Sequence, residues 1–274
     1  MPMTPATLAA NRPIGVFDSG LGGLSVLREI RTLLPAEDLL YVADAAHVPY
    51  GNRSPAQIRA RAEVLTGFLV GRGVKSVVVA CNTATAVAVT DLRARWSIPI
   101  IGMEPAIKPA AALTRNGIVG VLATEGTLAS ARFAGLLEQY AGRARVVTQP
   151  CPGLVAAVEA GHLDGEHARA LLRRYLRPLQ EARADTMILG CTHYSFLVPL
   201  IRELLGPDVA IVDTGYAVAR QLQRRLHDGA ALCAPARSGT EHFWTTGDAV
   251  TGASVLNRLW GGAPALQALR PGEG

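Results

Sequence analysis

Short apolar runs rich in β-branched residues alternate with longer amphipathic segments along this chain, and that alternation restricts its possible folds more than any other feature. In the first half, the apolar runs lie at residues 13–18, 38–45, 75–81 and 98–103, with segments of helical periodicity between them. Strands that alternate with helices are typical of parallel sheets in which each crossover connection is a helix. The pattern predicts an α/β fold.

The same alternation starts again in the second half of the chain. Apolar runs lie at residues 119–124, 144–149, 184–191 and 208–214, and amphipathic segments again separate them, the first at residues 126–141. Four strands therefore follow one another in the same order twice. Duplication explains that order better than a chance similarity between strand-turn-helix units.

Individual residues support the repeat. Gly15 matches Gly120 at an offset of 105 residues, and Cys81 matches Cys191 at an offset of 110. We therefore expect two similar lobes related by a pseudo-two-fold axis, each a parallel sheet flanked by helices. Ligands of open parallel sheets bind beyond the carboxyl ends of the strands, so the active site is expected in the cleft between the lobes.

The boundaries of these lobes follow from where the repeat begins and ends. We expect residues 1–104 and 217–274 to form a discontinuous first lobe, and residues 105–216 to form the second. The chain would cross between the lobes near Pro105 and again near "DTGYA" at 213–217. A C-terminal helical segment would then return to the first lobe.

Two of the apolar runs end on a cysteine that small polar residues follow. "VVVACNTATA" contains Cys81, and "TMILGCTHYS" contains Cys191. If each cysteine ends a strand and opens a helix, free N–H groups at the helix N-terminus would lower the thiol pKa from about 8.5 toward neutrality. Each thiol could then act as an acid or as a base.

Two thiols that face each other across a cleft suggest a chemistry that one thiol does not. A pair could remove a proton from one face of a carbon and deliver a proton to the other face, as racemisation without a cofactor requires. The alternative for either cysteine alone is a small buried hydrophobic residue. Cys151, in the Pro-flanked turn "QPCPG", and Cys233, in "LCAPA", are not expected to reach the cleft.

Polar residues follow the expected strands in a consistent way. They include Asp18, Ser19, Tyr50, Gly51, Asn82, Thr83, Thr192 and His193. Hydroxyl groups, an amide and helix N-terminal N–H groups can bind carboxylates without a permanent cation. The stretch "DSGLGG" also resembles a phosphate loop, but it lacks the full spacing of the nucleotide-binding motifs. An amino-acid dicarboxylate fits these residues better than a nucleotide.

Three further residues are candidates for assisting proton transfer. His193 lies two residues beyond Cys191 and could hold or relay the proton of that thiol, although a histidine at a helix start is as often a hydrogen-bonded surface residue. Asp18 has the equivalent opportunity beside Cys81. Glu159, in "VEAG", could serve the second lobe.

Composition excludes several other classes of protein. The 274 residues are 49% hydrophobic, which is enough for one large or two small cores. Four cysteines without a C-x-x-C pair, no export signal and no long apolar run predict reduced thiols in a soluble, cytoplasmic protein. The net charge of +5 comes mainly from arginines at helical spacing, so we expect solvated helix faces and no nucleic-acid or membrane partner.

Seven stretches taken together resemble the aspartate/glutamate racemase family, and its glutamate racemases in particular. They are "GVFDSGLGGLSV", "DAAHVPYGNRS", "VVACNTATA", "GVLATEGTLAS", "VEAG", "LGCTHY" and "TGD". The resemblance covers residues from about 14 to 250. It implies a cofactor-independent enzyme that supplies D-glutamate for peptidoglycan. The run "VADAAH" and the Ala-rich N-terminal segment depart from the family pattern.

The resemblance also implies roles for individual residues. Cys81 would serve D-glutamate and Cys191 L-glutamate as the two acid/base residues, and Asp18, Glu159 and His193 would assist proton transfer. Substrate contacts would come from the polar strand-end residues given above, with Thr124 and Thr127 close by. We expect neither a metal nor pyridoxal phosphate. We expect the protein to form a homodimer. The alternatives are an aspartate-type racemase of the same fold and a non-catalytic two-lobed protein that binds an acidic amino acid.

Overall fold

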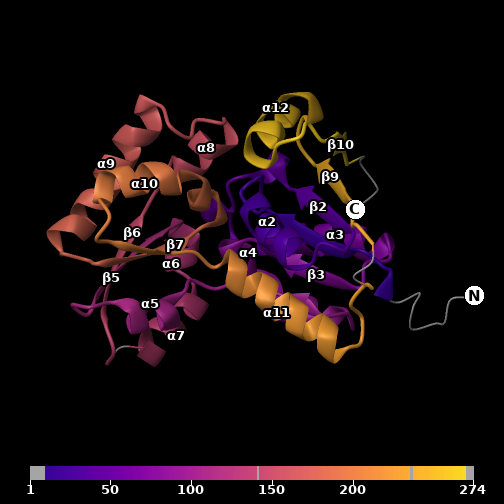
Figure 1. Ribbon diagram of the computed structural model, residues 1–274, viewed down its shortest axis with the longest axis horizontal. Helices are drawn as coiled ribbons and strands as arrows, with labels where there is room; N and C mark the ends of the chain where they lie inside the picture. Colours follow the sequence, from indigo (N-terminus) through magenta and orange to yellow (C-terminus); the bar gives the residue numbers. More distant parts are fainter. Residues whose placement is uncertain (1–9, 141, 235–236, 270–274) are drawn as a thin grey trace, which may run out of the picture.

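A computed structural model describes residues 10–140, 142–234 and 237–269 of the chain. The remaining residues include both ends of the proposed first lobe and the last residue of the helix expected at 126–141. Two lobes lie side by side in Figure 1, each built around its own sheet. The lobes meet at the carboxyl ends of their strands, where the candidate site residues are located.

Within the described residues, the sheet of the first lobe contains six strands, all parallel, in the order β10-β9-β2-β1-β3-β4. The strands are β1 (Ile14–Asp18), β2 (Leu39–Ala43), β3 (Ser76–Val79), β4 (Ile100–Ile101), β9 (Glu241–Thr245) and β10 (Leu266–Ala268). The first four are completely buried, as expected for parallel strands covered by helices on both faces.

The sheet of the second lobe contains four described strands, again all parallel, in the order β6-β5-β7-β8. They are β5 (Ile118–Ala123), β6 (Arg145–Pro150), β7 (Thr186–Gly190) and β8 (Ala210–Val212). This order repeats β2-β1-β3-β4 of the first lobe strand for strand. Gly15 pairs with β2 and β3, and Gly120 pairs with β6 and β7, so the two glycines occupy equivalent places. The prediction of two similar parallel-sheet lobes is confirmed.

Helices cover both faces of each sheet. In the first lobe they are α2 (Leu24–Leu33), α3 (Pro55–Gly71), α4 (Asn82–Arg95), α11 (Gly215–Asp228) and α12 (Ala249–Trp260), with the short 3₁₀ helices η1 (Ala45–His47) and η2 (Tyr50–Asn52). In the second they are α5 (Ile107–Leu113), α6 (Glu125–Leu128), α7 (Ala131–Tyr140), α8 (Leu154–Glu159), α9 (Glu166–Glu181) and α10 (Val198–Leu205), with the 3₁₀ helix η3 (Thr192–Leu197).

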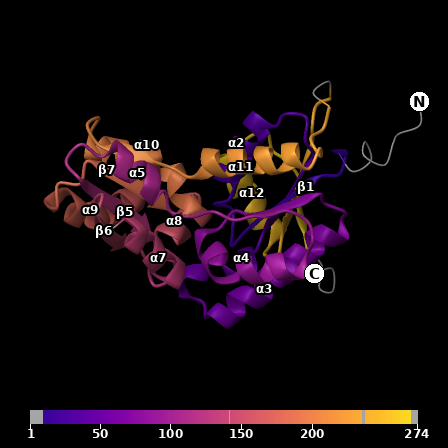
Figure 2. The ribbon, with the colours of Figure 1, turned by 90° about the horizontal axis from the view of Figure 1, so that it is seen from below.

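The buried side chains form three clusters that follow this layering. One lies between the first sheet and α3 and α4, and another lies between the second sheet and α5 and α7. The third contains Leu24 and Leu27 of α2 together with Leu172 and Leu176 of α9, so it extends through both lobes. Figure 2 shows α11 on one side of the first sheet and α3 and α4 on the other.

Three elements differ from the expectations. The helix expected from residue 126 is divided into α6 and α7, because the Ser130 hydroxyl accepts the N–H of Phe133 and starts a new helix. The segment after Cys191 begins as η3 and not as an α-helix. The C-terminal segment contains strands β9 and β10 as well as helices, and β9 pairs with β2.

The strands before residue 104 and those after residue 217 belong to one sheet, and the strands between them belong to the other. The division at residues 104/105 and 216/217 remains our proposed boundary. No helix in the described ranges is both long and apolar enough to cross a membrane.

Candidate active site

One pocket between the lobes collects most of the residues expected to form the site. Ten of the thirteen candidates line it, namely Ser19, Tyr50, Gly51, Cys81, Asn82, Thr83, Thr124, Cys191, Thr192 and His193. About 280 Å³ of space lies between its protein atoms, part of it at the open mouth. The other three candidates are Asp18, Glu159 and Thr127. They do not line the pocket themselves, but each contacts a residue that does.

Cys81 follows β3 directly and is the residue before α4. Its Sγ accepts a hydrogen bond from the backbone N–H of Ala84 at 3.5 Å and donates to Ser19 Oγ at 3.9 Å. We expected the helix N-terminus to lower the pKa of this thiol, and that expectation is wrong. Burial and the charge of Asp18 raise the pKa of Cys81 well above its ordinary value, against the opposing effect of the Ala84 N–H. Burial thus opposes ionisation of this thiol more strongly than the helix N-terminus favours it.

Cys191 follows β7 at the equivalent place in the second lobe. Its Sγ lies 3.6 Å from Nδ1 of His193, and Nε2 of the same imidazole lies 2.6 Å from Oε1 of Glu159. His193 is buried, not a surface residue. Burial lowers the pKa of His193, but hydrogen bonds with Cys191 and Glu159 and the charges of both groups raise it further, to well above its ordinary value. Thiol, imidazole and carboxylate thus form a continuous chain.

Asp18 is fully buried beneath the other wall. Its Oδ2 accepts hydrogen bonds from the backbone N–H of Gly23 at 2.7 Å and from the Thr192 hydroxyl at 3.4 Å. Burial raises the pKa of Asp18, although the charge of His193 and two backbone hydrogen bonds oppose that rise. The carboxyl acts on Cys81 through its charge, and Ser19 is the side chain that contacts the Cys81 thiol.

Asn82 presents an unusual amide group to the pocket. Both its Oδ1 and its Nδ2 are buried and have no hydrogen-bond partner. A buried amide without partners costs free energy that a polar ligand would recover. The amide therefore marks this part of the pocket as a binding surface for a polar group.

Three hydroxyl groups join the lobes beside Asn82. Oγ1 of Thr83 on α4 lies 2.9 Å from Oγ1 of Thr124 and 3.0 Å from Oγ1 of Thr127, and the last two are 3.0 Å apart. Thr83 comes from the first lobe and the other two come from the second. These distances place Thr124 and Thr127 next to Thr83, and a contact of either with substrate stays a prediction.

Tyr50 is held in place by Asp44, a residue that we did not predict as part of the site. The Tyr50 hydroxyl donates to Oδ2 of Asp44 at 2.6 Å, and Arg61 donates to both oxygens of that carboxylate at 3.0 and 2.9 Å. Thr246, on the turn after β9, donates to Oδ1 at 2.8 Å. Asp44 directly follows β2, so the strand-end position that identified Asp18 could also have identified Asp44.

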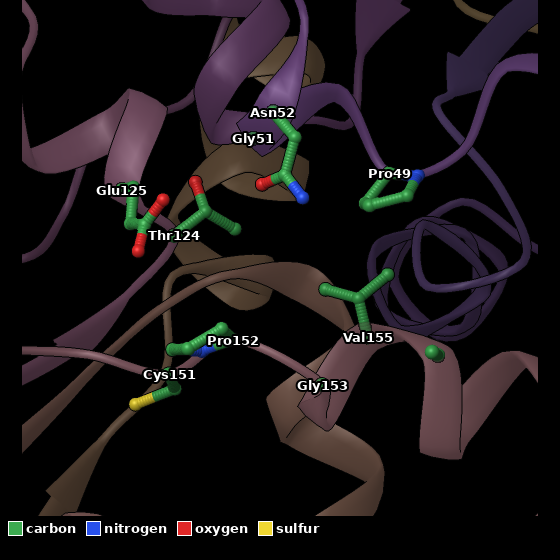
Figure 3. A pocket seen from close by; sticks show the side chains of 10 residues that line it. Pro49, Gly51, Asn52, Thr124, Glu125, Cys151, Pro152, Gly153 and Val155 are labelled. Atoms are coloured by element: carbon green, nitrogen blue, oxygen red, sulfur yellow. The ribbon is translucent and has the colours of Figure 1, made fainter.

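The expectation that Cys151 lies in a turn and not at the end of a strand is wrong, but Cys151 is not among the residues that line the pocket of Cys81 and Cys191. Cys151 directly follows β6 and is buried at the carboxyl edge of the second sheet. It lines a second pocket of about 380 Å³, which shares Pro49, Gly51, Thr124 and Val155 with the first. Its thiol donates to the carbonyl of Gln149 at 3.3 Å, and in Figure 3 the sulfur points away from the middle of this pocket.

Cys233 lies elsewhere in the molecule. Its Sγ is 3.7 Å from Nζ of Lys75, which precedes β3 and so marks the opposite end of the first sheet. In the described ranges, no group of three or more histidine, cysteine, aspartate or glutamate residues is arranged to hold a metal ion.

The fold and the site together define a class of protein. Two parallel-sheet lobes each bring one cysteine, from the end of an equivalent strand, to a shared pocket that also contains a buried imidazole and an unpartnered amide. Two groups able to exchange protons with one small polar molecule are what an amino-acid racemase without a bound cofactor needs.

Comparison with known proteins agrees with this class and identifies the family. Residues 14–222 match the model of the Asp/Glu/Hydantoin racemase family. A glutamate racemase from Pseudomonas paraeruginosa is 58% identical over 254 residues, which cover 92% of this chain and 96% of that one. The chain belongs to the Asp/Glu/hydantoin racemase family and is an isomerase by descent.

Solved structures support the same assignment. A glutamate racemase isoform from Bacillus anthracis superposes with a TM-score of 0.87 at 33% identity, covering 95% of this chain and 98% of that one. Escherichia coli glutamate racemase, solved with L-glutamate and the activator UDP-MurNAc-ala, superposes with a TM-score of 0.83 at 35% identity. That match covers 94% of this chain and 98% of the other.

Proposed function

We propose that this protein interconverts L- and D-glutamate by proton transfer at Cα, with one cysteine on each side of the substrate. The observation that carries the proposal is that Cys81 and Cys191, from equivalent strands of the two lobes, line the same pocket. The relatives named glutamate racemase, at up to 58% identity over most of both chains, support glutamate as the substrate. D-Glutamate for peptidoglycan is the expected use of the product.

In the direction from L- to D-glutamate, the thiolate of Cys191 removes the Cα proton and the thiol of Cys81 donates a proton to the opposite face. The electron pair of the broken C–H bond moves into the carboxylate as enediolate-like charge and then forms the new C–H bond. In the reverse direction the cysteines exchange roles. His193 and Glu159, already hydrogen-bonded in series with Cys191, assist the proton transfers on that side.

Neutral donors and the substrate's own charge complete the site. The residues that line the described pocket include no arginine or lysine, so the two carboxylates would be bound by the Asn82 amide, threonine hydroxyls and backbone N–H groups. The α-ammonium group would lie near the buried carboxyl of Asp18. A cation at this position also favours the thiolate form of Cys81, against the burial and the Asp18 charge that raise the pKa of this thiol.

Two further parts of the proposal concern the protein as a whole. We infer a homodimer and a location in the cytoplasm, where a free D-amino acid would enter cell-wall precursor synthesis. Both rest on the family resemblance of the sequence. Sedimentation of the full chain at micromolar concentration measures the first.

Substitution of the cysteines tests the proposed function. Cys81→Ala and Cys191→Ala should each abolish racemisation in both directions, since either loss removes the acid for one direction and the base for the other. The assay follows the circular dichroism of L- and of D-glutamate over time, with aspartate as the competing substrate. Cys233→Ala is the matched control, because Cys233 is equally buried but lies at the other end of the sheet.

Folding is checked by thermal unfolding, because truncation of a buried cysteine costs on the order of 1 kcal/mol through packing alone. Cys151→Ala is not a neutral control, since Cys151 lines the adjoining pocket. A folded Cys81→Ala or Cys191→Ala variant that racemises glutamate near the parent rate would refute the proposal. If the parent protein turned over aspartate faster than glutamate, aspartate would be the preferred substrate.

A further inference from the structure

The loop "DSGLGG", residues 18–23, joins β1 to α2 and contacts the proton-transfer chain of the second lobe. The backbone N–H of Leu21 donates to Oε1 of Glu159 at 2.6 Å, and the Ser25 hydroxyl donates to the carbonyl of Thr192 at 3.2 Å. The first bond joins two residues that are 138 positions apart in the chain, and the second joins two residues that are 167 positions apart. The loop therefore lies directly on the second lobe.

Gly22 lies against the imidazole of His193. A Cβ atom at Gly22 would lie 2.2 Å from Nδ1 of His193 and 2.5 Å from Cε1 and Cγ. Nδ1 is the atom that contacts Cys191, and the ring is almost completely buried. A methyl group at this position would force the ring away from the thiol, because the buried ring has little free space around it.

Gly20 lies against the carboxylate that holds the other side of the same ring. A Cβ atom at Gly20 would lie 2.2 Å from Oε1 of Glu159. That oxygen accepts hydrogen bonds from Leu21 N–H and from His193 at once, both at 2.6 Å. A side chain at Gly20 would displace the oxygen that fixes the orientation of the imidazole.

Backbone conformation does not explain these glycines. Neither Gly20 nor Gly22 has the positive φ that would require glycine, in contrast to Gly153 at 87°. What both positions require is the absence of a side chain. Gly23 extends the pattern to the other wall, since its Cβ would lie 2.7 Å from Cβ of Asp18.

We propose that Gly20 and Gly22 are positioning residues of the proton-transfer site: their missing side chains let the first lobe close onto Glu159 and His193 and hold the imidazole against Cys191. The inference rests on the proposed function. It assigns the glycines of this loop to catalysis through His193, and not to binding a phosphate group. The chain from Cys191 to Glu159 lies within the second lobe, and the first lobe adds the hydrogen bond from Leu21 N–H to Glu159 and the contact of Gly22 with the imidazole.

Gly22→Ala is the direct test, with Gly67→Ala as the matched control. Gly67 lies inside α3, and a Cβ at Gly67 would meet no atom within 4 Å. Gly22→Ala should lower kcat/KM for glutamate by roughly 10- to 100-fold, as expected for a displaced catalytic group, while Gly67→Ala should keep the parent value. Both variants should unfold within a few degrees of the parent.

Isotope effects separate a positioning role from general damage. L- and D-glutamate have equal free energy, so kcat/KM must fall equally in both directions for any variant. Slower proton transfer at Cys191 makes that step more rate-limiting. Gly22→Ala should therefore raise the deuterium isotope effect on kcat/KM for L-[2-²H]glutamate and lower it for the D-enantiomer.

A double-mutant cycle with His193→Asn gives the second readout. Asparagine is shorter than histidine and removes the ring that a methyl group at Gly22 would strike. The loss caused by Gly22→Ala should therefore largely disappear in the His193→Asn background. If Gly22→Ala does not fold, a double-mutant cycle of Gly20→Ala with Glu159→Ala provides the same test, because a Cβ at Gly20 would meet the Glu159 carboxylate.

Two results would overturn the inference. One is a folded Gly22→Ala variant with the activity and isotope effects of the parent. The other is a loss of activity that persists undiminished in the His193→Asn background, which would mean that the loop acts independently of the imidazole. A parent protein that does not racemise glutamate would refute the proposed function instead, so the two failures are distinguishable.

Discussion

Asp44 offers a test of how the first lobe holds its part of the pocket. Its carboxylate is completely buried and accepts hydrogen bonds from Arg61, Tyr50 and Thr246, with His47 Nδ1 at 3.1 Å. The substitution Asp44→Asn keeps the size of the side chain and removes its charge. One of the two oxygens becomes an NH₂ group, which faces donors and cannot accept their hydrogen bonds.

The magnitude follows from the groups left unpaired. Removing one partner of a buried ion pair costs about 3–5 kcal/mol. The side chain of Arg61 remains 23% exposed, so water recovers part of that loss. A lost acceptor for the buried Tyr50 hydroxyl adds about 1 kcal/mol. We expect the free energy of unfolding to fall by about 3 kcal/mol, which lowers Tm by roughly 6 °C in a chain of this size.

The substitution should also raise KM for glutamate, because Asp44 orients Tyr50, which lines the pocket. Urea and thermal unfolding measure the first effect, and initial rates measure the second. Asp91→Asn is the control: its ion pair with Arg59 has the same chemistry at 3.1 Å, but both side chains are about half exposed, so little change is expected. An Asp44→Asn protein within 1 kcal/mol of the parent and with an unchanged KM would refute the reasoning.

Two further predictions follow from the titrating groups. In D₂O, the product enantiomer should carry deuterium at Cα while the remaining substrate initially gains little, and equally rapid exchange into both would indicate a single mobile base. The pKa of His193 is raised from 6.5, so its contribution to stability is complete below pH 6.5 and is lost as the pH rises through the higher folded value. The difference in unfolding free energy between parent and His193→Asn, measured in urea, should therefore shrink with rising pH above 6.5, and a constant difference would contradict the shift.

Although β6 and β8 are partly exposed, most of the repeated apolar runs form buried strands, and for that reason much of the fold could be predicted. Such strands are continuous in the sequence, and helical segments separate them. Strand β10 was missed because it has only three residues, which pair with β9. Strand β9 was missed because it pairs with a strand far away in sequence: Glu241 lies opposite Leu39. A pairing across that separation depends on the rest of the first lobe, and local sequence does not reveal it.

The site was predictable wherever a functional residue lies at the end of a strand, and less so where its contacts cross between lobes. Cys81, Cys191 and their polar neighbours follow β3 and β7 directly, so the topology alone brings them to one pocket. The hydrogen bond from Leu21 to Glu159 depends on the angle between the lobes. The prediction of a lowered pKa for Cys81 was wrong for a related reason. Burial raises this pKa by more than the helix N-terminus lowers it, and the extent of burial is known only from the three-dimensional structure.

The two walls of the pocket have equivalent backbones but different chemistry. Cys81 precedes an α-helix, receives the Ala84 N–H and lies near the buried carboxyl of Asp18, whereas Cys191 precedes a 3₁₀ helix and contacts His193. This asymmetry is compatible with a reaction whose equilibrium constant is one. Because the enantiomers have equal free energy, kcat/KM is equal in both directions whatever groups stand on each side. The equilibrium constant therefore fixes only the ratio of the two kcat/KM values, and the two thiols can have different partners without changing that ratio.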